Sequence, residues 1–188
     1  MNLLTIFEQA TPQEVFEGMA WYDEAHELAR SISDQFGVSL DVVAGVIAAL
    51  SPRSKWERNI TDGKNILTAY VTGEDPAAVP VTTFNRNKAR AIEILEAGTR
   101  HGALSGPKVC AFADNIEDPD GDIVTVDSHA YNAWAGERVI VNGTGPTITP
   151  KRFRECAADY RKLAIVYGIS PPQAQAIVWL AWKRIHNI

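Results

Sequence analysis

Two short stretches decide the fold of this chain: LSGPKVCAF at residues 104–112 and IVTVDSHAY at residues 123–131. In the first, a Gly-Pro turn leads into an apolar helical pattern that opens at Lys108. In the second, an extended β-branched run ends at Asp127, where a new helical pattern begins. The two residues are 19 positions apart (127 minus 108), and both are expected at helix N-termini, where free N–H groups and the helix dipole favour negative charge. An amine and a carboxylate presented together at such a place can act on a bound anionic ligand.

Helix start signals continue outward from these stretches to both ends of the chain. Thr11 and Glu14 form a capping-box pattern, and Ser170 precedes a proline that suits the first helical position. Helices are expected over residues 11–36, 41–50, 58–71, 87–97, 108–116, 128–135, 150–167 and 171–185. The strand-like runs at 123–126 and 139–141 are too short to carry a sheet, so the sequence predicts an all-α fold.

The composition is that of an ordinary globular protein, with 188 residues of which 46% are apolar and 22% charged. The first ten residues lack a basic cluster, and no apolar run approaches the roughly 18 residues that cross a bilayer. Neither a signal peptide nor a membrane span is therefore expected, and the expected location is the cytoplasm. The two cysteines, Cys110 and Cys156, are too few for a four-cysteine metal or iron-sulfur site, so no metal and no cofactor are expected.

The charge pattern gives two opposing indications about nucleic acid. The net charge of −5 argues against binding, because Lys and Arg supply most of the non-specific affinity for phosphates. The basic residues are nevertheless grouped, for example Arg53 with Lys55, Arg86 with Lys88, and residues 151–154. Both a one-sided basic face and a set of solvated helix faces are compatible with this pattern.

Four motifs occur in an order found in one enzyme superfamily: VIAALS at 46–51, NKARAI at 87–92, LSGPKV at 104–109 and VDSH at 126–129. On these motifs, residues 41–134 resemble the helix-hairpin-helix (HhH-GPD) DNA glycosylase superfamily, which contains endonuclease III-like and 8-oxoguanine glycosylases. The short, altered hairpin is also similar to divergent relatives encoded by bacterial viruses.

The resemblance implies a two-lobed helical bundle with a cleft between the lobes. One lobe would span about residues 41–134, and the second would be formed by residues 1–40 and 135–188 together. No long polar linker or internal repeat divides the chain, so residues 1–188 are expected to form a single HhH-GPD-like unit.

The resemblance also implies roles for individual residues. Lys108 matches the Schiff-base lysine of the family, which attacks the sugar C1′, and Asp127 matches its catalytic aspartate. A base in a duplex must be extruded before it is cut, and Arg53 stands where the family inserts a side chain into the vacated space. The candidate DNA-contacting residues are Ser51, Arg53, Lys55, Trp56, Arg86, Lys88, Gly106 and His129.

Structural interpretations of the same residues stay open beside these roles. Asp127 could be only a helix N-cap, Lys108 a solvated lysine, and His129 a ring packed beside Trp134. The tryptophan and tyrosine residues on apolar helix faces are expected to be core: Trp21, Tyr22, Trp179 and Trp182.

One departure from the family keeps three functions open. The hairpin has a single glycine, Gly106, followed by Pro107, which lacks the N–H that would hold a DNA phosphate. The leading expectation is a DNA glycosylase, with or without AP lyase activity, that acts on double-stranded DNA containing a damaged or modified base. The alternatives are a transferase that joins an amine or amino acid to an activated 5-substituted pyrimidine in DNA, and a non-catalytic DNA-binding module.

Overall fold

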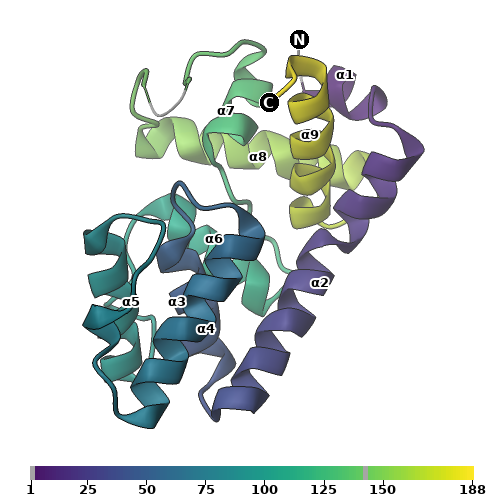
Figure 1. The fold of residues 1–188 in the computed structure, drawn as a ribbon. Coiled ribbons are helices and arrows are strands. Elements are labelled where there is room, and N and C mark those ends of the chain that lie inside the picture. Colours follow the sequence, from purple (N-terminus) through teal and green to yellow (C-terminus); the bar gives the residue numbers. More distant parts are fainter. Residues whose placement is uncertain (1–2, 142–143) are drawn as a thin grey trace. The chain divides into compact units, whose positions relative to one another are not determined.

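The computed structural model describes residues 3–141 and 144–188, and every regular element within them is helical (Figure 1). The elements in chain order are α1 (Leu3–Glu8), α2 (Pro12–Phe36), α3 (Leu40–Leu50), α4 (Trp56–Thr72), the 3-10 turn η1 (Pro76–Ala78), α5 (Asn85–Ala97), α6 (Pro107–Glu117), α7 (Ser128–Ala135), α8 (Pro150–Tyr167) and α9 (Pro171–His186). The predicted all-α class is confirmed. Among the described helices, none alone combines the length and the apolar character that crossing a membrane requires.

The predicted helix starts are confirmed where the sequence carries a cap. The Thr11 hydroxyl accepts the Glu14 N–H at 3.2 Å while the Glu14 carboxylate accepts the Thr11 N–H at 2.8 Å, which is the expected capping box. Ser170 and Gln173 form the same arrangement before α9. The prediction missed the six-residue helix α1 and the turn η1, because neither is long enough to show a helical period.

The chain divides into two compact units, which we describe separately. The terminal unit consists of residues 1–25 and 118–188, and the central unit consists of residues 26–117. These boundaries differ from those of the lobes expected from the sequence, and they assign Lys108 to the central unit but Asp127 to the terminal unit.

The central unit is built around α3. Every residue from Val42 to Leu50 is buried, and α3 packs against α4, α5 and α6. A helix that is apolar on all sides is stable only when it is buried, so the absence of a polar face on α3 agrees with its central position. Gly45 allows the α5–α6 loop to lie close against α3, because a Cβ at this position would be only 2.6 Å from the Arg100 Cβ.

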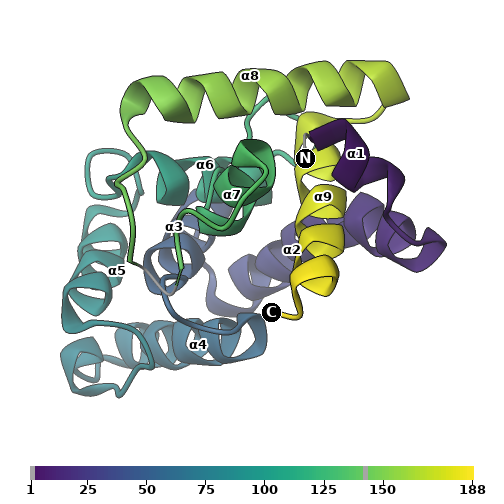
Figure 2. The same ribbon diagram turned by 90° about the horizontal axis from the view of Figure 1, so that it is seen from above.

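The terminal unit is built around α9, which packs against α1, α7 and α8 (Figures 1 and 2). Trp182 of α9 and Tyr160 of α8 are fully buried, and the Tyr160 hydroxyl donates to the Ala130 carbonyl of α7 at 3.1 Å. Gly18 of α2 allows a close approach to α9, because a Cβ there would lie 2.5 Å from the Ile177 side chain. Trp182 is therefore core as predicted, whereas Trp179 is only half-buried.

Candidate functional site

Lys108 lies in the first turn of α6, directly after the hairpin loop of the central unit. Gly106 has φ of 101°, a conformation that L side chains rarely adopt, and its carbonyl accepts the Cys110 N–H at 3.0 Å to begin the helix. Pro107 then occupies the first helical position, where its missing N–H costs nothing. The Lys108 side chain is half-buried and forms no ion pair with any described residue.

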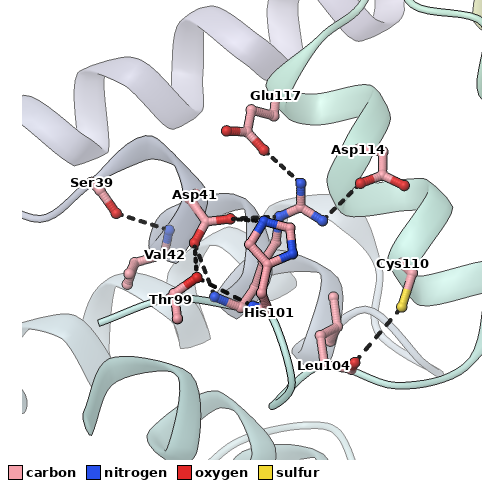
Figure 3. A network of polar contacts seen from close by, with 10 residues as sticks. Ser39, Asp41, Val42, Thr99, His101, Leu104, Cys110, Asp114 and Glu117 are labelled. Atoms are coloured by element: carbon pink, nitrogen blue, oxygen red, sulfur yellow. Dashed lines mark hydrogen bonds and ion pairs between the residues drawn. The ribbon is translucent and has the colours of Figure 1, made fainter. Parts of the chain in front are cut away.

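A buried arginine holds the hairpin loop in place (Figure 3). The Arg100 side chain, 9% exposed, forms ion pairs with Asp41 at 2.9 Å, Asp114 at 2.7 Å and Glu117 at 2.6 Å. Asp41 also accepts the Arg100 backbone N–H at 3.0 Å and the Thr99 hydroxyl at 2.7 Å. One side chain therefore ties the loop to the start of α3 and to α6, the helix that carries Lys108.

The electrostatics of this network follow from burial opposed by hydrogen bonds. Burial acts to lower the pKa of Arg100, but the contacts with Glu117 and Asp114 outweigh it and raise the pKa. Burial likewise acts to raise the pKa of Asp41, and the hydrogen bonds from Thr99 and from the Arg100 N–H outweigh it and lower the pKa. Both groups are thus held in their charged forms.

The face of α6 that carries Lys108 meets the start of α4. Lys108 and Phe112 are four residues apart, so they lie on the same face of the helix. The ring of Phe112 contacts that of Trp56 edge to face, with 6.4 Å between the centroids. The contact joins the face of α6 that carries Lys108 to the first residue of α4, directly after the 51–55 loop, which contains the predicted inserting residue.

The 51–55 loop contains a strained turn with Arg53 at its tip. The Ser54 N–H donates to the Ser51 carbonyl at 3.2 Å, and Pro52 and Arg53 are the central residues of the turn. Arg53 has φ of 62°, where glycine or asparagine is normally found. The Thr83 hydroxyl donates to the Pro52 carbonyl at 2.7 Å and thereby fixes this loop to the loop before α5.

An exposed aromatic ring that the sequence analysis missed lies beside this turn. Phe84 is 44% exposed, and the guanidinium groups of Arg53 and Arg86 lie 5.3 and 5.2 Å from its ring centroid. Neither arginine forms an ion pair with a carboxylate in the described part of the chain, and the same holds for the exposed Lys55. We call Arg53, Lys55, Phe84 and Arg86 the Phe84 surface.

Three other predicted DNA-contacting residues have structural contacts. The Lys88 ammonium donates to the carbonyls of Ala77 at 2.6 Å and Val79 at 3.0 Å, so it holds η1 and is not part of the Phe84 surface. The Ser51 hydroxyl donates to the Ala48 carbonyl at 2.9 Å at the end of α3. Trp56 is half-buried by its contact with α6.

Asp127 is the N-cap of α7 in the terminal unit. Its Oδ1 accepts the Ala130 N–H at 2.7 Å, which confirms the capping interpretation. Its Oδ2 accepts the indole N–H of Trp179 at 3.3 Å. Burial first, and the Asp127 charge in addition, raise the pKa of the Cys156 thiol and of the Tyr160 hydroxyl, so both stay protonated.

His129 packs beside Trp179, and not beside Trp134 as the sequence suggested. The two rings meet edge to face with 6.4 Å between centroids. The Nδ1 atom of His129 is buried and has no hydrogen-bond partner among the described residues. On the same helix face as Trp179, the Lys183 ammonium lies 3.9 Å from the indole centroid.

The structure thus groups the predicted residues into two sets. The central unit holds Ser51, Arg53, Lys55, Trp56, Arg86, Lys88, Gly106 and Lys108, and the terminal unit holds Asp127 and His129. The cleft shared by Lys108 and Asp127 stays a prediction. In the described ranges, no group of three or more His, Cys, Asp or Glu side chains could hold a metal ion.

Comparison with known proteins gives one match. The model of a family of unknown function (DUF7178) matches residues 1–186, which is nearly the whole chain. No curated protein and no solved structure matches the chain. The likeness to helix-hairpin-helix glycosylases accordingly rests on the four motifs alone.

Proposed function

Because the chain belongs to the DUF7178 family, whose function is unknown, we propose from its own residues that it is a DNA glycosylase-like enzyme. Its substrate is an extrahelical damaged or modified base in double-stranded DNA, and its reaction cleaves the N-glycosidic bond. The observation that carries the proposal is the Trp56–Phe112 contact, which links the Lys108 face of α6 to the loop of the Phe84 surface within one unit.

The Phe84 surface has the chemistry that a nucleic acid requires. Arg53, Lys55 and Arg86 lack carboxylate partners in the described residues, so their charges are available to phosphates. The exposed ring of Phe84 offers an apolar face to a base or a sugar. Arg53, at the tip of its turn, is our candidate for the side chain that fills the space left by the extruded nucleotide.

Lys108 and Asp127 supply the two groups that the reaction needs. The Lys108 nitrogen forms a bond to the sugar C1′ while the bond from C1′ to the base breaks, and the base leaves with the electron pair and takes up a proton. The Asp127 carboxylate stabilises the positive charge that develops on the sugar and accepts a proton from the amine. The bond between C1′ and the ring oxygen then breaks, the ring oxygen takes up the proton that Asp127 accepted, and a Schiff base results, which water hydrolyses to an abasic site and the free Lys108 amine.

Borohydride trapping tests the proposal. The purified protein is incubated with duplexes that carry a panel of damaged and modified bases, and borohydride reduces any Schiff base to a stable adduct. We expect an adduct with the wild type and none with Lys108→Ala. Lys64→Ala is the matched control, since Lys64 is also a half-buried lysine of the central unit and forms no ion pair with a described residue. Absence of both adduct and abasic product across the panel contradicts the proposal.

A transferase on the same scaffold is the second candidate, and the hairpin favours it. Pro107 follows Gly106 at the position where the glycosylase hairpin has further N–H groups for phosphate, so the DNA is held differently here. Mass spectrometry of nucleosides from treated DNA separates the candidates: base loss indicates a glycosylase, and a heavier pyrimidine indicates a transferase. Salt-dependent binding without either product indicates a non-catalytic DNA-binding module.

A further inference from the structure

The Asp127 carboxylate is held by two donors, of which only one belongs to the helix cap. The Ala130 N–H binds Oδ1 at 2.7 Å, as any N-cap requires. The Trp179 indole N–H binds Oδ2 at 3.3 Å and comes from α9, 52 residues further along the chain. Donors on both oxygens fix the plane of the carboxylate and determine where its remaining lone pairs point.

The indole is itself held from a second side. Lys183 follows Trp179 by one helical turn on α9, and its ammonium lies 3.9 Å from the indole centroid. A cation over the ring is attracted to its electron density and draws density from the N–H, which strengthens the N–H as a donor. The His129 ring meets the indole edge to face and limits its rotation further.

We infer that Trp179 is a positioning residue that orients the Asp127 carboxylate, and that Lys183 holds the indole in the donating position. The inference rests on the proposed function in so far as Asp127 acts on the sugar. Trp179 contacts Asp127, and Lys183 contacts Trp179, but neither residue needs to touch the DNA. One helix, α9, thus supplies both the orienting donor and the charge that keeps the donor in place.

The terminal unit contains a matched control for this arrangement. The Trp134 indole N–H donates to Asp159 at 2.8 Å, and the Lys162 ammonium contacts the same carboxylate at 2.7 Å. The residue types are therefore the same in both places. Asp159 is not among the proposed catalytic groups, so deleting the Trp134 N–H removes an equivalent hydrogen bond without touching the site.

Steady-state kinetics give the first test. Trp179→Phe removes the N–H and keeps an aromatic ring, and we expect kcat to fall about tenfold or more with KM changed less than twofold, because a hydrogen bond to a charged group is lost but the DNA surface is intact. Lys183→Met keeps the length of the side chain, and we expect a smaller fall in kcat. Trp134→Phe should change neither constant. An unchanged kcat in Trp179→Phe, or an equal fall in Trp134→Phe, overturns the inference.

A second readout does not depend on activity. The indole N–H signals are compared by ¹H–¹⁵N NMR between the wild type and Asp127→Ser, whose hydroxyl still caps α7 but is too short to reach the indole. We expect the Trp179 signal to shift and to exchange faster with solvent, and the Trp134 signal to stay in place. An unshifted Trp179 signal overturns the inference even in an active enzyme. A shifted signal in a protein inactive on every substrate upholds the geometry and refutes the proposed function.

Discussion

Asp127 caps α7 and has a proposed second role in catalysis, and a single substitution separates the two. Its Oδ1 caps α7, whereas its charge is what the proposed reaction needs. In Asp127→Ser we expect the cap of α7 to be kept, because serine is as good an N-cap as aspartate, and the free energy of unfolding to fall by about 1 kcal/mol, because the hydrogen bond from Trp179 is lost. We expect base release to be lost. Asp127→Ala should lose activity and, because the cap is lost as well, about 1 kcal/mol more stability than Asp127→Ser. Urea unfolding and product assays on both variants check this, and an active Asp127→Ser variant would show that the residue is only a cap.

Arg53 adopts a strained backbone conformation, which places its side chain at the tip of the turn but lowers the stability of the protein. Its φ of 62° costs an L residue about 1 kcal/mol or more, which glycine avoids. Arg53→Gly is therefore expected to raise the free energy of unfolding by about 1 kcal/mol and to weaken duplex binding, with the salt dependence reduced by about one phosphate contact. Arg53→Lys keeps both charge and strain, so it should gain no stability. Equal duplex binding by the wild type and Arg53→Gly would show that Arg53 does not contact DNA.

At the scale of elements, the Arg100 network ties the second half of α6 to the start of α3. Its guanidinium neutralises three carboxylates in a half-buried site, and no other described cation lies close enough to all three to replace it. Arg100→Met is expected to destabilise the protein by about 3 kcal/mol, since the carboxylates lose their partner but keep their charges. Denaturant unfolding measures this. A loss below about 1 kcal/mol would mean that the three acids are well solvated without Arg100.

The same network makes the stability of the central unit depend on pH in the acid range. The pKa of Asp41 is lowered in the folded state, against the effect of burial, by its hydrogen bonds from Thr99 and Arg100. The carboxylate therefore contributes stability that is fully present above its unfolded pKa of about 4 and is lost as the pH falls through its lower folded pKa. The free energy of unfolding, measured between pH 7 and pH 2, should fall less with decreasing pH in Asp41→Asn than in the wild type. Parallel curves would contradict the assignment.

At the scale of the whole molecule, the sequence predicted the helices well because their signals are local. Ser128–Ala135 and Pro150–Tyr167 have the predicted bounds, since a cap precedes each and a glycine follows. The boundaries of the two compact units could not be predicted in the same way, because they depend on contacts between residues far apart in the chain. Residues 118–134 follow α6 directly, yet they pack with the chain ends.

The same limit applies to the site. The turn of Gly106 and the cap of Asp127 could be predicted, because each is encoded within four residues. The exposure of Phe84 could not, because it depends on how two arginines pack on its ring. Nor could the contact from Trp179 to Asp127, which joins positions 52 residues apart.

A double substitution tests whether the two units act on one nucleotide. If Lys108 and Asp127 serve the same reaction, the rate lost in Lys108→Ala combined with Asp127→Ser should be no greater than that of the more damaging single variant, because groups that act together are not additive. Single-turnover base release measures all four proteins. If the fold-loss of rate in the double variant equals the product of the fold-losses in the two single variants, the two residues act independently.

The buried thiol of Cys156 makes the terminal unit report on its own opening. Cys156 is fully buried, and burial together with two nearby carboxylates raises the pKa of its thiol, whereas Cys110 of the central unit is only half-buried. A thiol-specific alkylating reagent therefore modifies Cys156 only when the terminal unit unfolds. Peptide mapping after brief alkylation in rising urea would follow the loss of this core without any added probe.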